Sequence, residues 1–153
     1  MKTFKREIAT ILLQLRGCPW AGHPEVADVI AEYIHFERSG KTPTQSRRVS
    51  LQIFHASRAI DSLLSHVVRN EASKAGRPAA PPNATLGSSQ VYVRNNGIGG
   101  LRFSVPVDGD IDSIRNDRNH YLHRANCFPN DGIIGQFLSR TIRAISEATT
   151  FPP

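Results

Sequence analysis

TQSRRVSLQIFHASRAIDSLLSHVVRNEA, residues 44–72, carries the longest helical pattern in the chain and contains no glycine or proline. Its apolar residues recur at near-heptad steps, which places them along one side of a helix. They are Val49, Ile53, Ala56, Ile60, Leu63 and Val67. A helix of this length can serve as the spine of a helical bundle or of a dimer, so the stretch predicts a mainly α fold.

Four shorter segments show the same three- and four-residue spacing of apolar side chains. Turn formers or helix-starting prolines bound several of them. The predicted segments are residues 4–17, 24–39, 108–126 and 131–149. The chain is about as long as one ordinary domain. We therefore expect a single domain over residues 1–153, built as a bundle of about five helices.

The region between the third and fourth predicted helices has a different composition. Residues 75–90, AGRPAAPPNATLGSSQ, are rich in turn formers and predict a flexible loop. In residues 91–105, VYVR and LRFSV flank the glycine-rich NNGIGG, which predicts a small β-hairpin insertion. A two-stranded ribbon is marginal alone, so this hairpin would have to pack against the helices.

Composition and charge indicate a soluble protein with a plausible nucleic-acid partner. The formal charge is +6, and fifteen of the nineteen basic residues are arginine, which binds phosphate as a planar fork. These arginines are scattered and form no polybasic tract. The two cysteines form no C-x-x-C pair and suit a reducing cytosol. The N-terminal apolar run is too short for a membrane span, so we expect a cytoplasmic protein without membrane contact.

Residues 115–124, RNDRNHYLHR, contain two overlapping Arg-Asn-x-x-x-His runs within the fourth predicted helix. Projected onto a helix, its apolar residues lie on one side: Ile111, Ile114, Tyr121, Leu122 and Ala125. The opposite side holds Asp112, Arg115, Asn116, Asn119, His123 and Asn126. Arg118 falls along the apolar side. Because a buried unpaired guanidinium is very costly, Arg118 must meet an anion, a partner subunit or the rim of a cleft.

This segment resembles the motif of the HEPN superfamily, small helical proteins in which an arginine, usually followed by asparagine, precedes a histidine on a late helix. Arg118, Asn119 and His123 match the fuller pattern, and Leu122 supplies the hydrophobic residue before the histidine. The overlapping run through Arg115, Asn116 and His120 also fits, so both registers stay open. This chain differs from the family pattern in two ways. Arg124 follows the histidine, where many members have a small residue. The predicted β-hairpin is not part of a simple helical bundle.

Many HEPN proteins are metal-independent ribonucleases, and the resemblance implies that activity here. His123 would transfer the proton of the ribose 2′-hydroxyl, since imidazole titrates near neutral pH. Arg118 would stabilise the charge on the phosphorane, and Asn119 would orient His123 or hold the phosphate. Further substrate contacts are expected from Arg115, Asn116, His120, Tyr121 and Arg124. No metal or cofactor is expected.

The resemblance also implies a homodimer, because in-line cleavage usually needs both an acid and a base. Pairing through the 108–126 helix would bring two copies of the same patch together. A toxin or defence effector acting on RNA, with a possible antitoxin partner, fits this activity. Two alternatives remain: a non-catalytic HEPN-like module that binds RNA, nucleotide or protein, and a helical DNA-binding or scaffold protein.

The remaining histidines are expected to be structural. His55 and His66 lie on the long predicted helix, where a satisfied structural histidine is the commoner case. His23 and His35 have no carboxylate or cysteine partner at the spacing of a metal-ligand motif.

Overall fold

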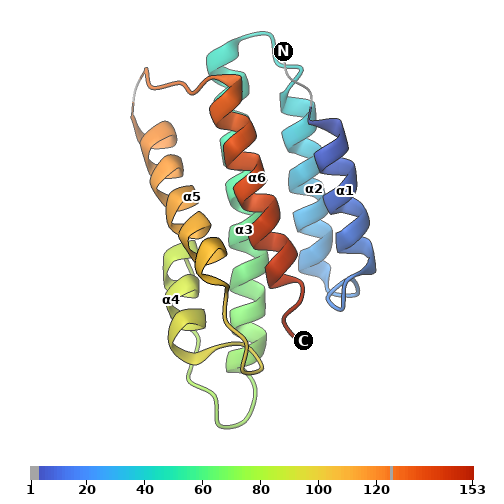
Figure 1. Cartoon of the computed structure of the whole chain (residues 1–153), viewed down its shortest axis with the longest axis vertical. Coiled ribbons are helices and arrows are strands. Elements are labelled where there is room, and N and C mark those ends of the chain that lie inside the picture. Colours follow the sequence, from blue (N-terminus) through green and yellow to red (C-terminus); the bar gives the residue numbers. More distant parts are fainter. Residues whose placement is uncertain (1–3, 125) are drawn as a thin grey trace.

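The computed structural model describes residues 4–124 and 126–153 and, within them, forms six helices (Figure 1). Figure 1 shows α3 and α6 in the middle of the bundle, with α1 and α2 on one side and α4 and α5 on the other. The helices are α1 Lys5–Gly17, α2 Pro24–Ser39, α3 Gln45–Ala72, α4 Leu86–Asn96, α5 Val105–His123 and α6 Asp131–Ala148. The described helices include none with the length and apolar character that crossing a membrane requires.

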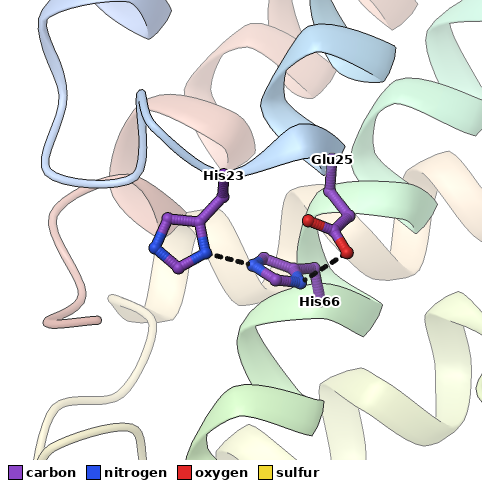
Figure 2. Close-up of side chains that lie close together, drawn as sticks. All are labelled: His23, Glu25 and His66. Carbon is purple, nitrogen blue, oxygen red and sulfur yellow. Dashed lines mark hydrogen bonds and ion pairs between the residues drawn. The ribbon is translucent and has the colours of Figure 1, made fainter.

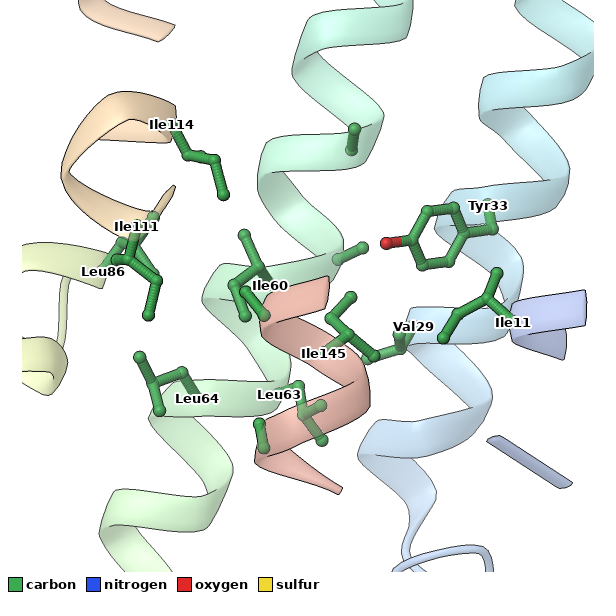
Figure 3. Packing of buried hydrophobic residues seen from close by; sticks show 14 of the residues in the cluster. Ile11, Val29, Tyr33, Ile60, Leu63, Leu64, Leu86, Ile111, Ile114 and Ile145 are labelled. Atoms are coloured by element: carbon green, nitrogen blue, oxygen red, sulfur yellow. The ribbon is translucent and has the colours of Figure 1, made fainter. Parts of the chain in front are cut away.

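Helix α3 is the spine of the bundle, as its heptad-like pattern predicted. It packs against α2, α4, α5 and α6. All six of its patterned apolar residues are buried, and the cluster around them takes side chains from every helix. Figure 3 shows this continuity: the buried side chains extend from Leu86 of α4 on one side, past Ile60 and Ile145 in the middle, to Tyr33 of α2 and Ile11 of α1 on the other. The mainly helical fold class is confirmed.

The loop between α1 and α2 is anchored by Trp20, which is fully buried. Its indole Nε1 donates a 2.7 Å hydrogen bond to the carbonyl oxygen of Phe151, beyond the end of α6. A second link joins Gln14 of α1 to Ser146 of α6, whose hydroxyl donates a 2.9 Å bond to Gln14 Oε1. These contacts fix the C-terminal segment against the first helix and its loop.

The predicted β-hairpin over residues 91–105 is wrong, because the VYVR segment lies inside helix α4. The predicted loop also ends earlier, at Thr85, whose side chain accepts from the backbone amide of Ser88 in a capping box. The buried side of α4 includes Leu86, Ser89, Gln90 and Val93, at helical spacing. Two of these residues are polar, which hid the helical pattern and left the β-branched valines to suggest a strand.

The second half of the predicted hairpin is a tight turn rather than a strand. Ile98 and Leu101 exchange two backbone hydrogen bonds, of 2.8 and 2.9 Å, and no other ladder pairing occurs among the described residues. Gly97 makes the turn possible, since its φ of +67° lies in the region that favours glycine. Helix α5 then begins at Val105, three residues before the predicted start at 108, and ends at His123 instead of 126.

Glu71, near the end of α3, holds this turn and the segment after α3 in place. Its carboxylate is 2% exposed and lies 2.7 Å from Arg77 Nε and 2.9 Å from Lys74 Nζ. It also accepts a hydrogen bond of 3.1 Å from the backbone amide of Gly99. Desolvation raises the pKa of Glu71, but the contacts with Lys74, Gly99 and Arg77 outweigh it, so the pKa lies below its ordinary value of 4.5.

Glu71→Gln is expected to lower the free energy of unfolding at pH 7 by about 1–3 kcal/mol, because it removes the charge that pairs with two cations. Because the pKa of Glu71 is lower in the folded state than in the unfolded state, the ionised carboxylate stabilises the fold above pH 4.5. This contribution is lost as the pH falls through the folded-state pKa. The difference between the two proteins should therefore shrink in urea denaturation at about pH 3.5. Glu7→Gln, on the exposed side of α1, is the matched control. A difference that is unchanged in acid would contradict the assignment.

Candidate functional site

Helix α5 carries the Arg-Asn-x-x-x-His segment and is held firmly against its neighbours. Its buried residues Val107, Ile111 and Ile114 belong to the common core. Aspartates along the helix pair with arginines of α4 and α6: Asp108 with Arg94 at 2.7 Å, Asp110 with Arg143 at 2.8 Å and Asp117 with Arg140 at 2.9 Å. The polar residues of the segment are therefore presented from a fixed element.

Arg118 points toward α3, where it lies beside Asp61. Its Nη1 is 3.9 Å from Asp61 Oδ2, and both side chains are 33% exposed. The residue thus meets an anion, one of the three environments that its position on the apolar side demanded. Burial raises the pKa of Asp61, while Arg118 and Arg58 lower it, and the net shift is upward. The other carboxylate oxygen of Asp61, Oδ1, is buried and has no hydrogen-bond partner within residues 4–124 and 126–153.

Arg115 points in another direction, toward α4. Its Nη1 lies 3.3 Å from Gln90 Oε1 and 3.4 Å from Asp112 Oδ1. The guanidinium lies against the backbone of Gly87, where an added Cβ would come within 2.8 Å of it. Arg115 therefore contacts residues of α4 and α5, Arg118 contacts Asp61 of α3, and the two guanidinium groups do not form one anion site among the described residues.

The exposed side of α5 presents the rest of the motif to solvent. Asn116, Asn119 and His123 are exposed, as is Arg124 just beyond the helix, and none of these side chains forms a hydrogen bond or ion pair with another described residue. His120 is partly buried, and its Nε2 lies 2.9 Å from the Cys127 Sγ. The structure thus gives His123 no competing partner among the described residues.

Tyr121 lies partly buried against the core, with its ring 4.8 Å from that of His120. Its placement is that of a packing residue, and Leu122 also packs there. Ala125, expected on the same side, lies outside the described residues.

In each register, the arginine and the histidine expected to act on one phosphate point in different directions from α5. Positions five apart on a helix differ by about 140°, which applies to Arg118 with His123 and to Arg115 with His120. The structure therefore brings neither pair together within one chain. By the same period, Asn119, His120 and His123 fall within about 100° of arc on the exposed side.

A second polar cluster joins the start of α2 to α3, and Figure 2 shows its three side chains. His23 Nδ1 lies 2.8 Å from His66 Nε2, and His66 Nδ1 lies 3.2 Å from Glu25 Oε1. Desolvation lowers the pKa of His66 and Glu25 raises it, with a net shift downward. A polar cavity of about 290 Å³ adjoins the cluster and is lined by residues that include Glu25 and Asp61.

The sequence offers His23 no partner at the spacing of a metal-ligand motif, but the structure places it beside His66, which in turn contacts Glu25. Sequence spacing could not reveal this cluster, because His66 comes from another helix. In the sequence, the one hint of this cluster is that His23 and Glu25 lie together at the start of a predicted helix.

Comparison with protein-family models, curated proteins and solved structures gives no match for this chain.

Proposed function

We propose that this chain is a metal-independent endoribonuclease of the HEPN type that cleaves RNA by attack of the ribose 2′-hydroxyl on the adjacent phosphate. The observation that carries the proposal is the placement of His123. Its imidazole is exposed and without a partner among the described residues, at the end of a helix whose other side is buried in the core. A residue that transfers protons to a large substrate needs this combination of access and fixed position.

His123 removes the 2′-hydroxyl proton, and Asn119, one turn earlier, orients the imidazole or holds the phosphate. The attacking oxygen forms a bond to phosphorus, the bond to the 5′-oxygen breaks, and a protonated His123 of the second chain in the proposed dimer donates a proton to that leaving group. The products are a 2′,3′-cyclic phosphate and a 5′-hydroxyl. Asn116, Arg124 and the partly buried His120 are available for further contacts with RNA.

Arg118 supplies the positive charge at the phosphorane in this proposal. Its contact with Asp61 is long, at 3.9 Å, and involves one nitrogen, which leaves guanidinium donors for a phosphate oxygen. Because Arg118 and His123 lie on different sides of α5, a single chain does not enclose one phosphate between them. A homodimer formed through α5 lets Arg118 of one chain act with His123 of the other.

The ion pair between Arg118 and Asp61 also favours a second candidate function, binding without catalysis. If Asp61 neutralises Arg118 permanently, the chain is a non-catalytic module that binds RNA or nucleotide through the exposed side of α5.

For the active enzyme, a role as a toxin or defence effector follows, since an unregulated ribonuclease harms its own cell and requires an inhibitory partner.

The test is incubation of purified protein with total RNA in EDTA. We expect strand breaks with 2′,3′-cyclic phosphate ends, and light scattering at micromolar concentration should show a dimer. Binding of RNA without strand breaks would select the non-catalytic module. Cleavage that requires added metal, or a monomer that cleaves at full rate, would overturn the proposed mechanism.

A further inference from the structure

The cluster formed by His23, Glu25 and His66 has the composition of a metal centre. Two imidazoles and one carboxylate are ligands that zinc and related divalent ions accept. One ligand atom from each residue lies within 4.8 Å of the other two. Figure 2 shows the three side chains in a row, with the His66 ring of α3 between His23 and Glu25 at the start of α2.

The positions of the protons in this cluster allow the two facing imidazole nitrogens to act as metal ligands. The His66 Nδ1 faces a carboxylate, which cannot donate, so a neutral ring carries its proton there. Its Nε2 then presents a lone pair to His23 Nδ1, only 2.8 Å away. A shift of the one proton between the two rings from His23 Nδ1 to Nε2 of the same ring leaves a lone pair on both facing nitrogens, which can then bind one cation. Glu25 Oε2 is buried and has no hydrogen-bond partner among the described residues, so it is available as the oxygen ligand.

The surroundings hold the rings in place. Trp20 is fully buried beneath them, with its ring 4.9 Å from that of His23 and 5.5 Å from that of His66. The His66 side chain is 14% exposed and that of Glu25 is 32% exposed, so the site is shielded but reachable. Zinc–nitrogen bonds of about 2.0–2.1 Å in a tetrahedral site separate two nitrogens by about 3.4 Å. The observed 2.8 Å must therefore open slightly, which a rotation of His23, in the loop before α2, can provide.

The geometry points to a binding site for one divalent transition metal of the zinc class, held by His23 Nδ1, His66 Nε2 and a Glu25 carboxylate oxygen, once the Glu25 side chain turns from His66 Nδ1 toward the ion. Three protein ligands leave a coordination position for water, as in many reactive zinc sites. Of the three residues, Glu25 also lines the polar cavity, together with Asp61. The cluster lies at the start of α2, whereas His123 ends α5 at the opposite end of the bundle (Figure 1). The metal is therefore separate from the proposed RNA chemistry.

The test uses full-length protein without an affinity tag, stripped with EDTA and then titrated with ZnCl2 by calorimetry. We expect saturable binding of one zinc per chain. His23→Gln, His66→Gln and Glu25→Gln should each weaken binding at least about tenfold, since loss of a ligand costs no less than loss of a residue that only supports one. The matched control is His55→Gln: His55 also joins α3 to α2, through Glu32 at 2.7 Å, and its loss should leave zinc binding unchanged.

Two further measurements keep the outcome clear. Circular dichroism of each variant shows whether it folds, and His23, in the loop before α2, offers a variant that does not disturb α3. The visible absorption of bound Co²⁺ should change in His23→Gln, because it reports nitrogen ligation. Absence of saturable binding to the wild type, or equal binding by folded His23→Gln and His66→Gln, would overturn the inference. RNA cleavage is measured in EDTA, so its success or failure is independent of this result.

Discussion

His123→Ala is expected to reduce the rate of RNA cleavage by about 10²–10⁴-fold, the usual contribution of a positioned acid–base group. The effect should fall on the rate of the chemical step, because the exposed side of α5 retains Asn116, Asn119 and Arg124 for binding RNA. Thermal stability should change little, since His123 is exposed and has no partner among the described residues. Single-turnover cleavage of a labelled oligonucleotide, together with its binding affinity, measures the two contributions separately.

The matched control is His120→Ala, three residues earlier on the same helix. His120 is partly buried against Cys127 and Tyr121, so a small loss of stability is expected with most of the activity retained. The opposite result, with full loss in His120→Ala and an active His123→Ala, would assign catalysis to the register through Arg115. Residual cleavage that is equal in both variants would indicate a contaminating nuclease.

Asp61 offers a way to test how Arg118 takes part. Asp61→Asn removes the charge beside Arg118 without changing the size of the side chain. If Asp61 holds Arg118 back from phosphate, cleavage by Asp61→Asn should be faster than that of the wild type. If it positions Arg118, the variant should be slower, and Arg118→Ala should be inactive in either case.

The helical fold could be predicted because its long helices are amphipathic. The bounds predicted for α2 and α3 agree with the structure almost to the residue, since Pro24 starts one helix and the heptad-like pattern of the other is continuous. Helix α4 was missed because Ser89 and Gln90 lie on its buried side. Gln90 is tolerated there because its Nε2 donates two 2.9 Å hydrogen bonds to Asp108, a residue that no local pattern connects to it.

The candidate site was predictable only in part, for a similar reason. The helical period placed His123 on the exposed side and Arg118 on the apolar side, and both placements agree with the structure. The partner of Arg118 is Asp61, on another helix, and the cluster around His66 also joins separate helices. Contacts of this kind depend on how helices pack, which the periodicity of one segment does not determine.

Trp20→Ala is expected to lower the free energy of unfolding by about 3–5 kcal/mol, the usual cost of removing a large aromatic side chain from a core. The substitution leaves a cavity between the loop before α2 and the C-terminal segment, and it leaves the carbonyl of Phe151 without its 2.7 Å hydrogen bond. For a domain of this size the melting temperature should fall by roughly 6–20 °C. Because Trp20 is the only tryptophan, circular dichroism must follow the denaturation.

Trp20→Phe separates the two contributions, since it retains an aromatic ring but removes the indole donor. It should cost about 1–3 kcal/mol for the unsatisfied carbonyl and the smaller ring. Leu13→Ala is the surface control: Leu13 lies on α1, is 74% exposed and should change stability by less than about 0.5 kcal/mol. A Trp20→Ala protein as stable as this control would mean that the loop and the C-terminal segment do not pack as described. Because the Trp20 ring also contacts His23 and His66, a correctly packed Trp20 is a condition for the zinc site as well.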